Sequence, residues 1–125
     1  LVRRDSPLAE RDAITPEDLV DKPLIVSRQA FSGALLSSWL GRGLDTLNVA
    51  ATYSLLYNAS LMVEEGMGCA LCLDGIINTS GDSPLCFRPL EPGLEVSVYF
   101  VWKKYRSFSK AAEKYMEALL AMLKE

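Results

Sequence analysis

Two cysteines, Cys69 and Cys72, have the C-x-x-C spacing that is shared by redox pairs and by half of a zinc site. They lie in an apolar run, residues 69–73, which follows Gly68 and predicts a strand buried on both faces. Residues three apart on a strand point to opposite faces, whereas a redox pair belongs at a helix N-terminus and zinc needs further ligands. With Cys86 the cysteine count is odd, which favours a reducing compartment. We interpret the pair as buried structural thiols.

Histidine is absent from the chain, which removes the commonest general base and the commonest metal ligand. Ser32-Gly33, close to Arg28, suggests an activated serine, but it has no histidine partner and no strand-to-serine elbow. A phosphate loop and a dinucleotide fingerprint are also missing from the sequence. We therefore expect no enzymatic activity, no metal site and no cofactor.

Polar residues follow the ends of three predicted strands. In a parallel sheet, ligands bind beyond the carboxyl ends of the strands, close to the N-termini of the following helices. Arg28 adds a planar guanidinium that can bind a carboxylate through two hydrogen bonds. The candidate ligand-contacting residues are Ser27, Arg28, Gln29, Ser32, Thr52, Tyr53 and Asp74.

Each of these positions also has a purely structural interpretation. Residues 27–32 can form an exposed loop with a capping serine, and Thr52 or Ser54 is expected to cap the next helix. Asp74 can start a turn with Gly75. At this stage both interpretations stay open.

The elements that must position these residues alternate between strand and helix from residue 24 to residue 73. Compact apolar strands are predicted at residues 23–27, 47–51 and 69–73. The first intervening helix carries Leu35, Leu36, Trp39 and Leu40 on one side, and the second carries Leu55, Leu56, Ala59, Met62 and Val63. The order β-α-β-α-β predicts an α/β fold with a parallel-core sheet and helices on both faces.

Particular residues mark the ends of the predicted helices. Gly66 supplies the left-handed conformation that lets the chain reverse after the second helix. Near the start of the chain, Thr15 is expected to cap a helix that begins at Pro16, because proline fits the first helical position. Ser109 is the expected N-cap of a terminal amphipathic helix.

The chain has 125 residues, half of them apolar, which is enough for one domain with a substantial core. Its 13 Lys and Arg against 16 Asp and Glu give a formal charge of −3, which argues against a free-standing nucleic-acid binder. No apolar run approaches the roughly 20 residues that span a bilayer, and no signal peptide opens the chain. Because the first residue is Leu1 rather than Met, we expect the chain to be part of a longer protein.

Several stretches, in a fixed order, resemble the effector-binding domain of LysR-type transcriptional regulators. The run from Asn58 to Leu71 matches the family signature V-x-x-G-x-G-x-A-L through Val63, Gly66, Gly68, Ala70 and Leu71. The other matching stretches are Asp5-Ser6-Pro7-Leu8-Ala9, Ile14-Thr15-Pro16-Glu17-Asp18-Leu19, Pro23-Leu24-Ile25-Val26-Ser27-Arg28, Leu85-Cys86-Phe87-Arg88-Pro89-Leu90 and Val98-Tyr99-Phe100-Val101-Trp102-Lys103-Lys104. These stretches are spread from residue 5 to residue 104, and the resemblance covers nearly the whole chain.

The resemblance implies a two-lobed domain like a type 2 periplasmic binding protein, with a small-molecule effector between the lobes. The chain is then expected to hold the second lobe, residues 5–95, between an incoming hinge strand at 1–4 and a returning one at 96–102. Residues 103–125 form the terminal helix, which in this family packs on the first lobe. The winged helix-turn-helix through which the family binds DNA is not in this sequence. A cytoplasmic location, no membrane contact and a homodimer or higher homo-oligomer are implied.

The terminal helix carries a broad apolar stripe that must be buried against something. The stripe consists of Phe108, Ala112, Tyr115, Leu119 and Leu123, widened by Ala111, Met116 and Met122. We therefore expect the isolated chain to self-associate. A lobe of a periplasmic solute-binding protein is the alternative function, and a small α/β enzyme is a third hypothesis that no motif supports.

Overall fold

The computed structural model describes residues 1–31, 34–97, 99–105 and 107–123. Two compact units make up the chain, Leu1–Glu95 and Val96–Glu125. The candidate residue Ser32 lies outside the described residues.

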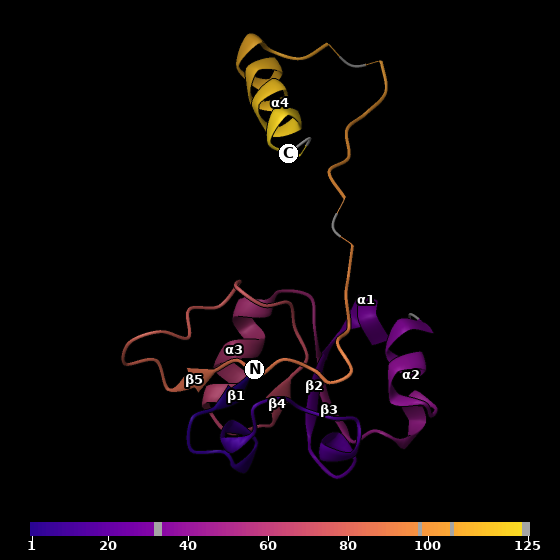
Figure 1. Ribbon diagram of the computed structural model, residues 1–125, viewed down its shortest axis with the longest axis vertical. Helices are drawn as coiled ribbons and strands as arrows, with labels where there is room; N and C mark the ends of the chain where they lie inside the picture. Colours follow the sequence, from indigo (N-terminus) through magenta and orange to yellow (C-terminus); the bar gives the residue numbers. More distant parts are fainter. Residues whose placement is uncertain (32–33, 98, 106, 124–125) are drawn as a thin grey trace. The chain divides into compact units, whose positions relative to one another are not determined.

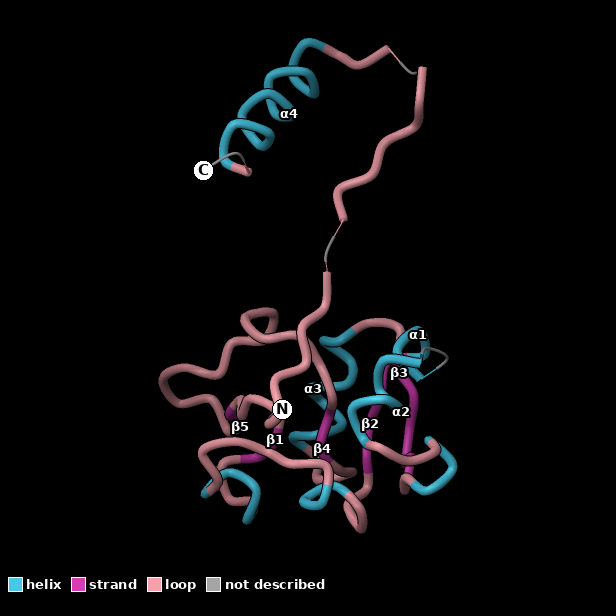
Figure 2. Tube along the Cα trace, turned by 45° about the vertical axis from the view of Figure 1, so that its right-hand side comes forward, coloured by secondary structure: helices cyan, strands magenta, loops and turns pink. Residues whose placement is uncertain are grey.

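A three-stranded parallel sheet forms the centre of the unit Leu1–Glu95. Strand β2 (Leu24–Ser27) lies between β3 (Val49–Tyr53) and β4 (Cys69–Ala70), and it is parallel to both (Figure 2). The register pairs Ser27 with Tyr53 at the carboxyl ends of β2 and β3. This arrangement confirms the predicted parallel core.

Helices connect the strands in the predicted order. α1 (Arg28–Phe31) and α2 (Ala34–Leu40) follow β2, and α3 (Leu56–Glu64) joins β3 to β4 (Figure 1). Three short 3₁₀ turns lie at Pro7–Glu10, Glu17–Leu19 and Leu44–Thr46.

The side chains of β2 alternate between two hydrophobic layers, one on each face of the sheet. Leu24, Ile25 and Val26 are completely buried, and burying each contributes about 1.5–3 kcal/mol. One layer contains Leu24, Val26, Cys69, Leu8, Ile14 and Leu19, with Trp39 of α2 packed against it. The other layer contains Ile25 and Ala70 with Ala59 and Val63 of α3. Helices therefore cover both faces of the sheet, as predicted.

A second, two-stranded sheet joins the start of the chain to the region around residue 85. β1 (Val2–Arg3) pairs in an antiparallel manner with β5 (Leu85–Cys86). The main chain of Leu1 exchanges two hydrogen bonds with Ala70, at 2.8 and 2.9 Å. Leu1 thereby connects the two sheets through β4.

The unit Val96–Glu125 contains helix α4 (Lys110–Met122), which Ser109 caps by accepting a hydrogen bond from the Ala112 N–H. This cap is as predicted. The Phe100 ring lies 6.5 Å from the Tyr115 ring, centroid to centroid. No described residue of α4 is buried: on its apolar stripe Ala112, Met116 and Leu119 are half-buried, whereas Tyr115, Met122 and Leu123 are exposed. No strand is assigned to the described residues of 96–102, and their role as a returning hinge strand stays a prediction.

Two predicted helix caps are wrong. β3 extends to Tyr53 and α3 begins at Leu56 without a side-chain cap, so neither Thr52 nor Ser54 caps that helix. Thr15 does not accept a cap hydrogen bond either; its own N–H and hydroxyl donate to the carboxylate of Asp18, at 3.0 and 3.1 Å. The side chain of Asp18 is therefore the acceptor in this turn, and Thr15 is the donor.

The length of the third strand and the buried face of the first helix also differ from the prediction. The third strand is only two residues long. The Leu71 N–H donates the last backbone hydrogen bond to β2, and none of the described residues that follow Leu71 adds another. In α2, Leu36 and Leu40 are buried and Trp39 is half-buried, but Leu35 is 49 % exposed. Leu35 therefore does not share the buried face expected for it.

Candidate functional site

The predicted ligand-contacting residues that the structure describes lie near one edge of the parallel sheet. We call this the carboxyl edge and define it as residues 27–29, 52–55 and 71–76, which follow or end β2, β3 and β4. In Figure 1 it is the border at which α1 follows β2. Neighbouring strands are about 4.8 Å apart, so residues from all three segments share this border.

Ser27, Arg28 and Thr52 present polar groups that are not used by other described residues. Arg28 and Thr52 are exposed and Ser27 is half-buried. None of the three side chains forms a hydrogen bond or an ion pair with a residue in the described ranges. Gln29 is exposed beside them. Because α1 has only four residues, its dipole adds little here, and the charge of Arg28 is the main electrostatic feature.

Tyr53 is engaged in the structure itself. Its hydroxyl donates a hydrogen bond of 2.8 Å to the carbonyl oxygen of Leu71, and its ring packs against the layer that contains Ile25 and Val63. Burial, and next the neighbouring Cys72 thiol, raise the pKa of Tyr53 to about 12. The Tyr53 phenol is therefore neutral at physiological pH.

Asp74 starts a turn with Gly75, as its structural interpretation predicted. Its carboxylate accepts a hydrogen bond of 2.7 Å from the Gly75 N–H, and Gly75 has a φ of +75°. The Asp74 side chain is exposed and leaves its second oxygen without a described partner. Asp74 therefore holds the turn and also presents a negative charge at the carboxyl edge.

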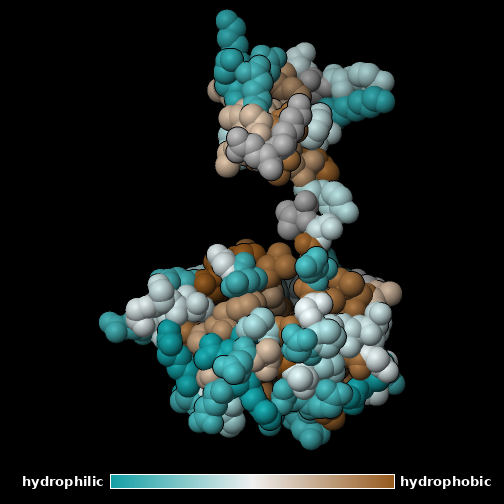
Figure 3. Space-filling view, in the orientation of Figure 1, coloured by the Kyte–Doolittle hydropathy of each residue, from teal (hydrophilic) through white to brown (hydrophobic). Residues whose placement is uncertain are grey.

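Exposed apolar residues stand beside these polar groups. Leu55 was expected on the apolar side of the second helix and Leu73 in a buried strand, and both expectations are wrong. Leu55, Leu73 and Ile76 are 60 %, 44 % and 58 % exposed. Hydrophobic surface gathers along the upper border of this unit in Figure 3. The available signal was their position at or beyond the carboxyl ends of the predicted strands, where an apolar residue has no layer to pack into. The carboxyl edge thus combines apolar and polar groups, which is typical of a small-molecule site.

The three cysteines are free thiols. Cys69 belongs to one hydrophobic layer and the half-buried Cys72 packs against the other, so their side chains lie on opposite faces as predicted. Burial raises the pKa of both thiols, although the chain's amino group partly opposes this shift. Neither thiol has the lowered pKa of a redox pair. The described residues also contain no group of three or more metal-binding side chains.

Two surface pockets lie at the opposite edge of the sheet. One, of about 240 Å³, is lined by Leu8, Arg11, Asp18 and Lys22, and another, of about 170 Å³, is lined by residues that include Pro23 and Gly68. Pro23 and Gly68 directly precede β2 and β4, so these pockets are at the amino ends of the strands. Around the first pocket, three acidic residues stand beside the basic Arg11 and Lys22. We therefore place the candidate site at the carboxyl edge.

The fold and this edge together define an α/β ligand-binding domain. The family model described as LysR substrate binding domain matches residues 1–124. The chain therefore belongs to this family, the effector-binding domains of LysR-type regulators, which are not enzymes. No curated protein and no solved structure matches the chain. Among the described helices, none is both long and apolar enough to cross a membrane.

Proposed function

We propose that the carboxyl edge binds the effector of a LysR-type transcriptional regulator and that this effector is a small carboxylate. The observation that carries the proposal is that a cationic group, hydroxyl groups and apolar side chains lie together at the carboxyl edge. The Arg28 guanidinium and the hydroxyls of Ser27 and Thr52 have no described partner, and the exposed Leu73 and Ile76 lie beyond the neighbouring strand.

Each group has a separate role in binding. The guanidinium of Arg28 pairs with the carboxylate through two hydrogen bonds, and the two hydroxyls donate to its oxygens or to a substituent. Leu73 and Ile76 cover the hydrocarbon part, because apolar surface favours leaving water. Asp74 repels a second negative charge and attracts an amino group, so it selects among carboxylates. Gln29 and Ser32 remain proposed contacts.

In this proposal the edge is one wall of a cleft. The second wall belongs to another lobe, which residues 1–4 and 96–102 connect to this one as hinge strands. Because an open wall buries little of a ligand, this chain alone binds the effector weakly. The effector shifts the population towards one closure angle only by as much as its affinity differs between the two arrangements.

We further propose that the regulator is a cytoplasmic homo-oligomer and that it binds DNA through a helix-turn-helix outside these 125 residues. Closure of the cleft then changes the geometry of the oligomer and so the spacing of the DNA-binding parts. The exposed Leu35 on α2 is a candidate contact between copies. Light scattering over a concentration series of this chain tests self-association, and a species that stays monomeric and compact at every concentration contradicts it.

A thermal-shift screen with substitutions tests the effector proposal. A panel of benzoate, succinate and amino acids should contain a compound that raises the melting temperature, with a larger shift when both lobes are present. Arg28→Gln should weaken that compound roughly tenfold or more, because a charge-assisted pair is lost. Arg42→Gln is the matched control, since Arg42 lies between α2 and β3 at the opposite edge. Equal effects of the two substitutions would contradict the proposed site.

A further inference from the structure

The Tyr53 side chain crosses the parallel sheet. Tyr53 belongs to β3 and Leu71 follows β4, and β2 lies between these two strands. The hydrogen bond from the Tyr53 hydroxyl to the Leu71 carbonyl, 2.8 Å, therefore spans β2 at the level of Ser27, the register partner of Tyr53. One side chain thus links the ends of all three strands.

This hydrogen bond also joins the start of the segment 71–76 to the far side of the sheet. The Leu71 N–H donates to the Ile25 carbonyl at 3.0 Å, which is the final ladder bond of β4. Beyond it, the chain's amino group, which donates to the Ala70 carbonyl of β4, also interacts with the Cys72 thiol. Among the described residues 73–76 the one hydrogen bond is the local one between Asp74 and Gly75. Cys72 and Ile77 also pack against the hydrophobic layer, but apolar contacts are not directional and do not fix the orientation of the segment.

We infer that Tyr53 is the positioning residue of the carboxyl edge: its hydroxyl fixes the segment 71–76 so that Leu73, Asp74 and Ile76 face a ligand in one arrangement. Tyr53 acts through the Leu71 carbonyl rather than by contact with the ligand. This inference rests on the proposed function for its purpose, but the restraint that it assigns to Tyr53 is measurable without any ligand.

Tyr53→Phe is the sharpest test, because it keeps the ring in the hydrophobic layer and removes only the hydroxyl. Tyr57→Phe is the matched control, since Tyr57 is 62 % exposed on α3 and its hydroxyl has no described partner. In the full chain without ligand, Tyr53→Phe should speed amide hydrogen exchange of residues 72–76 roughly fivefold to tenfold. Exchange in α3 should stay unchanged, and Tyr57→Phe should change neither region.

Alkylation of Cys72 by iodoacetamide gives a second readout of the same restraint. Cys72 follows Leu71 directly and is half-buried, whereas Cys69 and Cys86 are 8 % and 5 % exposed. Tyr53→Phe should raise the labelling rate of Cys72 severalfold and leave the rates of the other two thiols unchanged. Unchanged exchange at 72–76 together with unchanged Cys72 labelling would overturn the inference.

The two proposals fail in different ways. If Tyr53→Phe loosens the segment but no carboxylate or amino acid in the panel stabilises the wild-type protein, the restraint stands and the effector proposal fails. If a compound binds the wild type, the same substitution should weaken it severalfold while Tyr57→Phe does not. Equal binding by wild type and Tyr53→Phe would contradict the positioning role, whatever the exchange rates are.

Discussion

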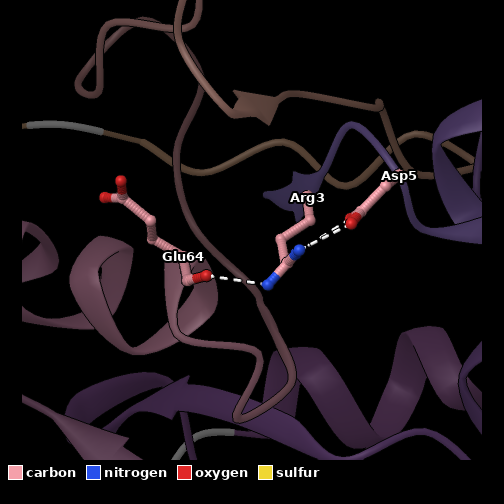
Figure 4. Close-up of polar contacts among 3 residues, drawn as sticks. All are labelled: Arg3, Asp5 and Glu64. Atoms are coloured by element: carbon pink, nitrogen blue, oxygen red, sulfur yellow. Dashed lines mark hydrogen bonds and ion pairs between the residues drawn. The ribbon is translucent and has the colours of Figure 1, made fainter.

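The guanidinium of Arg3 donates a hydrogen bond of 3.1 Å to the carbonyl oxygen of Glu64, and so ties β1 to the last turn of α3 (Figure 4). The same guanidinium forms an ion pair with Asp5. A cation at a helix C-terminus satisfies a carbonyl that the helix leaves unpaired and interacts favourably with the helix dipole. Arg3 therefore joins the proposed incoming hinge strand to the helix that covers one face of the sheet.

Arg3→Gln should loosen this junction, because a neutral amide replaces the guanidinium that pairs with Asp5 and donates to the Glu64 carbonyl. We expect faster hydrogen exchange in the last turn of α3 and in β1, and a lower melting temperature. Hydrogen exchange resolved to these segments makes the measurement. Arg42→Gln serves as the control, and a melting temperature that falls as much in the control would argue against a specific junction.

Asp18 should make the stability depend on pH at the acidic end. Hydrogen bonds from Thr15, with Arg11 nearby, hold the pKa of Asp18 below its usual value of 3.8, despite partial burial. A carboxylate with a lowered pKa contributes stability above pH 3.8, and this contribution is lost as the pH falls through the folded-state pKa.

Asp18→Asn should therefore lower the free energy of unfolding by about 1 kcal/mol at pH 7 and by less at pH 2. Chemical denaturation at both pH values gives the two differences. Asp12→Asn, at an exposed position with no described partner, is the control. A loss that is the same at both pH values would show that the charge of Asp18 is not what stabilises this turn.

Gly68 should tolerate no side chain. Its φ is +154°, and a Cβ built on it would lie 2.2 Å from the carbonyl oxygen of Pro23. Gly68→Ala should cost about 2–4 kcal/mol, because the start of β4 must move away from β2. Gly81→Ala, where φ is +60° and no atom lies within 4 Å, should cost only about 1 kcal/mol. Similar losses of unfolding free energy in the two variants would contradict this account.

Trp39 should anchor the chain where it leaves the first unit. Its indole N–H donates a hydrogen bond of 2.6 Å to the Pro92 carbonyl, shortly before the second unit begins at Val96. Trp39→Phe should lower the free energy of unfolding by about 1 kcal/mol and speed proteolysis near residue 92. Trp102→Phe, at a half-exposed position of the second unit, is the control and should do neither.

The periodicity of the apolar residues predicted the order of strands and helices from residue 24 to residue 73, because the pattern of each strand and helix is visible in its own residues. The same reasoning placed Cys69 and Cys72 on opposite faces. The boundaries were less predictable. β3 extends to Tyr53, beyond its apolar run, because pairing with β2 holds polar residues in the strand as well. That extension is why Thr52 does not cap α3.

The long-range features of the carboxyl edge could not be predicted from the sequence. The bond between Tyr53 and Leu71 depends on the spatial order β3-β2-β4, which no local pattern specifies. The exposure of Leu55 and Ile76 likewise depends on where the layers end. The sequence indicated which polar residues follow the strands, but not that Tyr53 is engaged and Arg28 has no described partner.

An NMR titration of the chain with a carboxylate that stabilises it tests the central claim most directly. Chemical shifts of backbone amides map where the compound binds. We predict changes at residues 27–29, 52–55 and 71–76, and Arg28→Gln should require a roughly tenfold or higher concentration of the compound to produce them. Changes concentrated around Arg11, Lys22 and Pro23, at the pockets of the opposite edge, would contradict the proposed effector site.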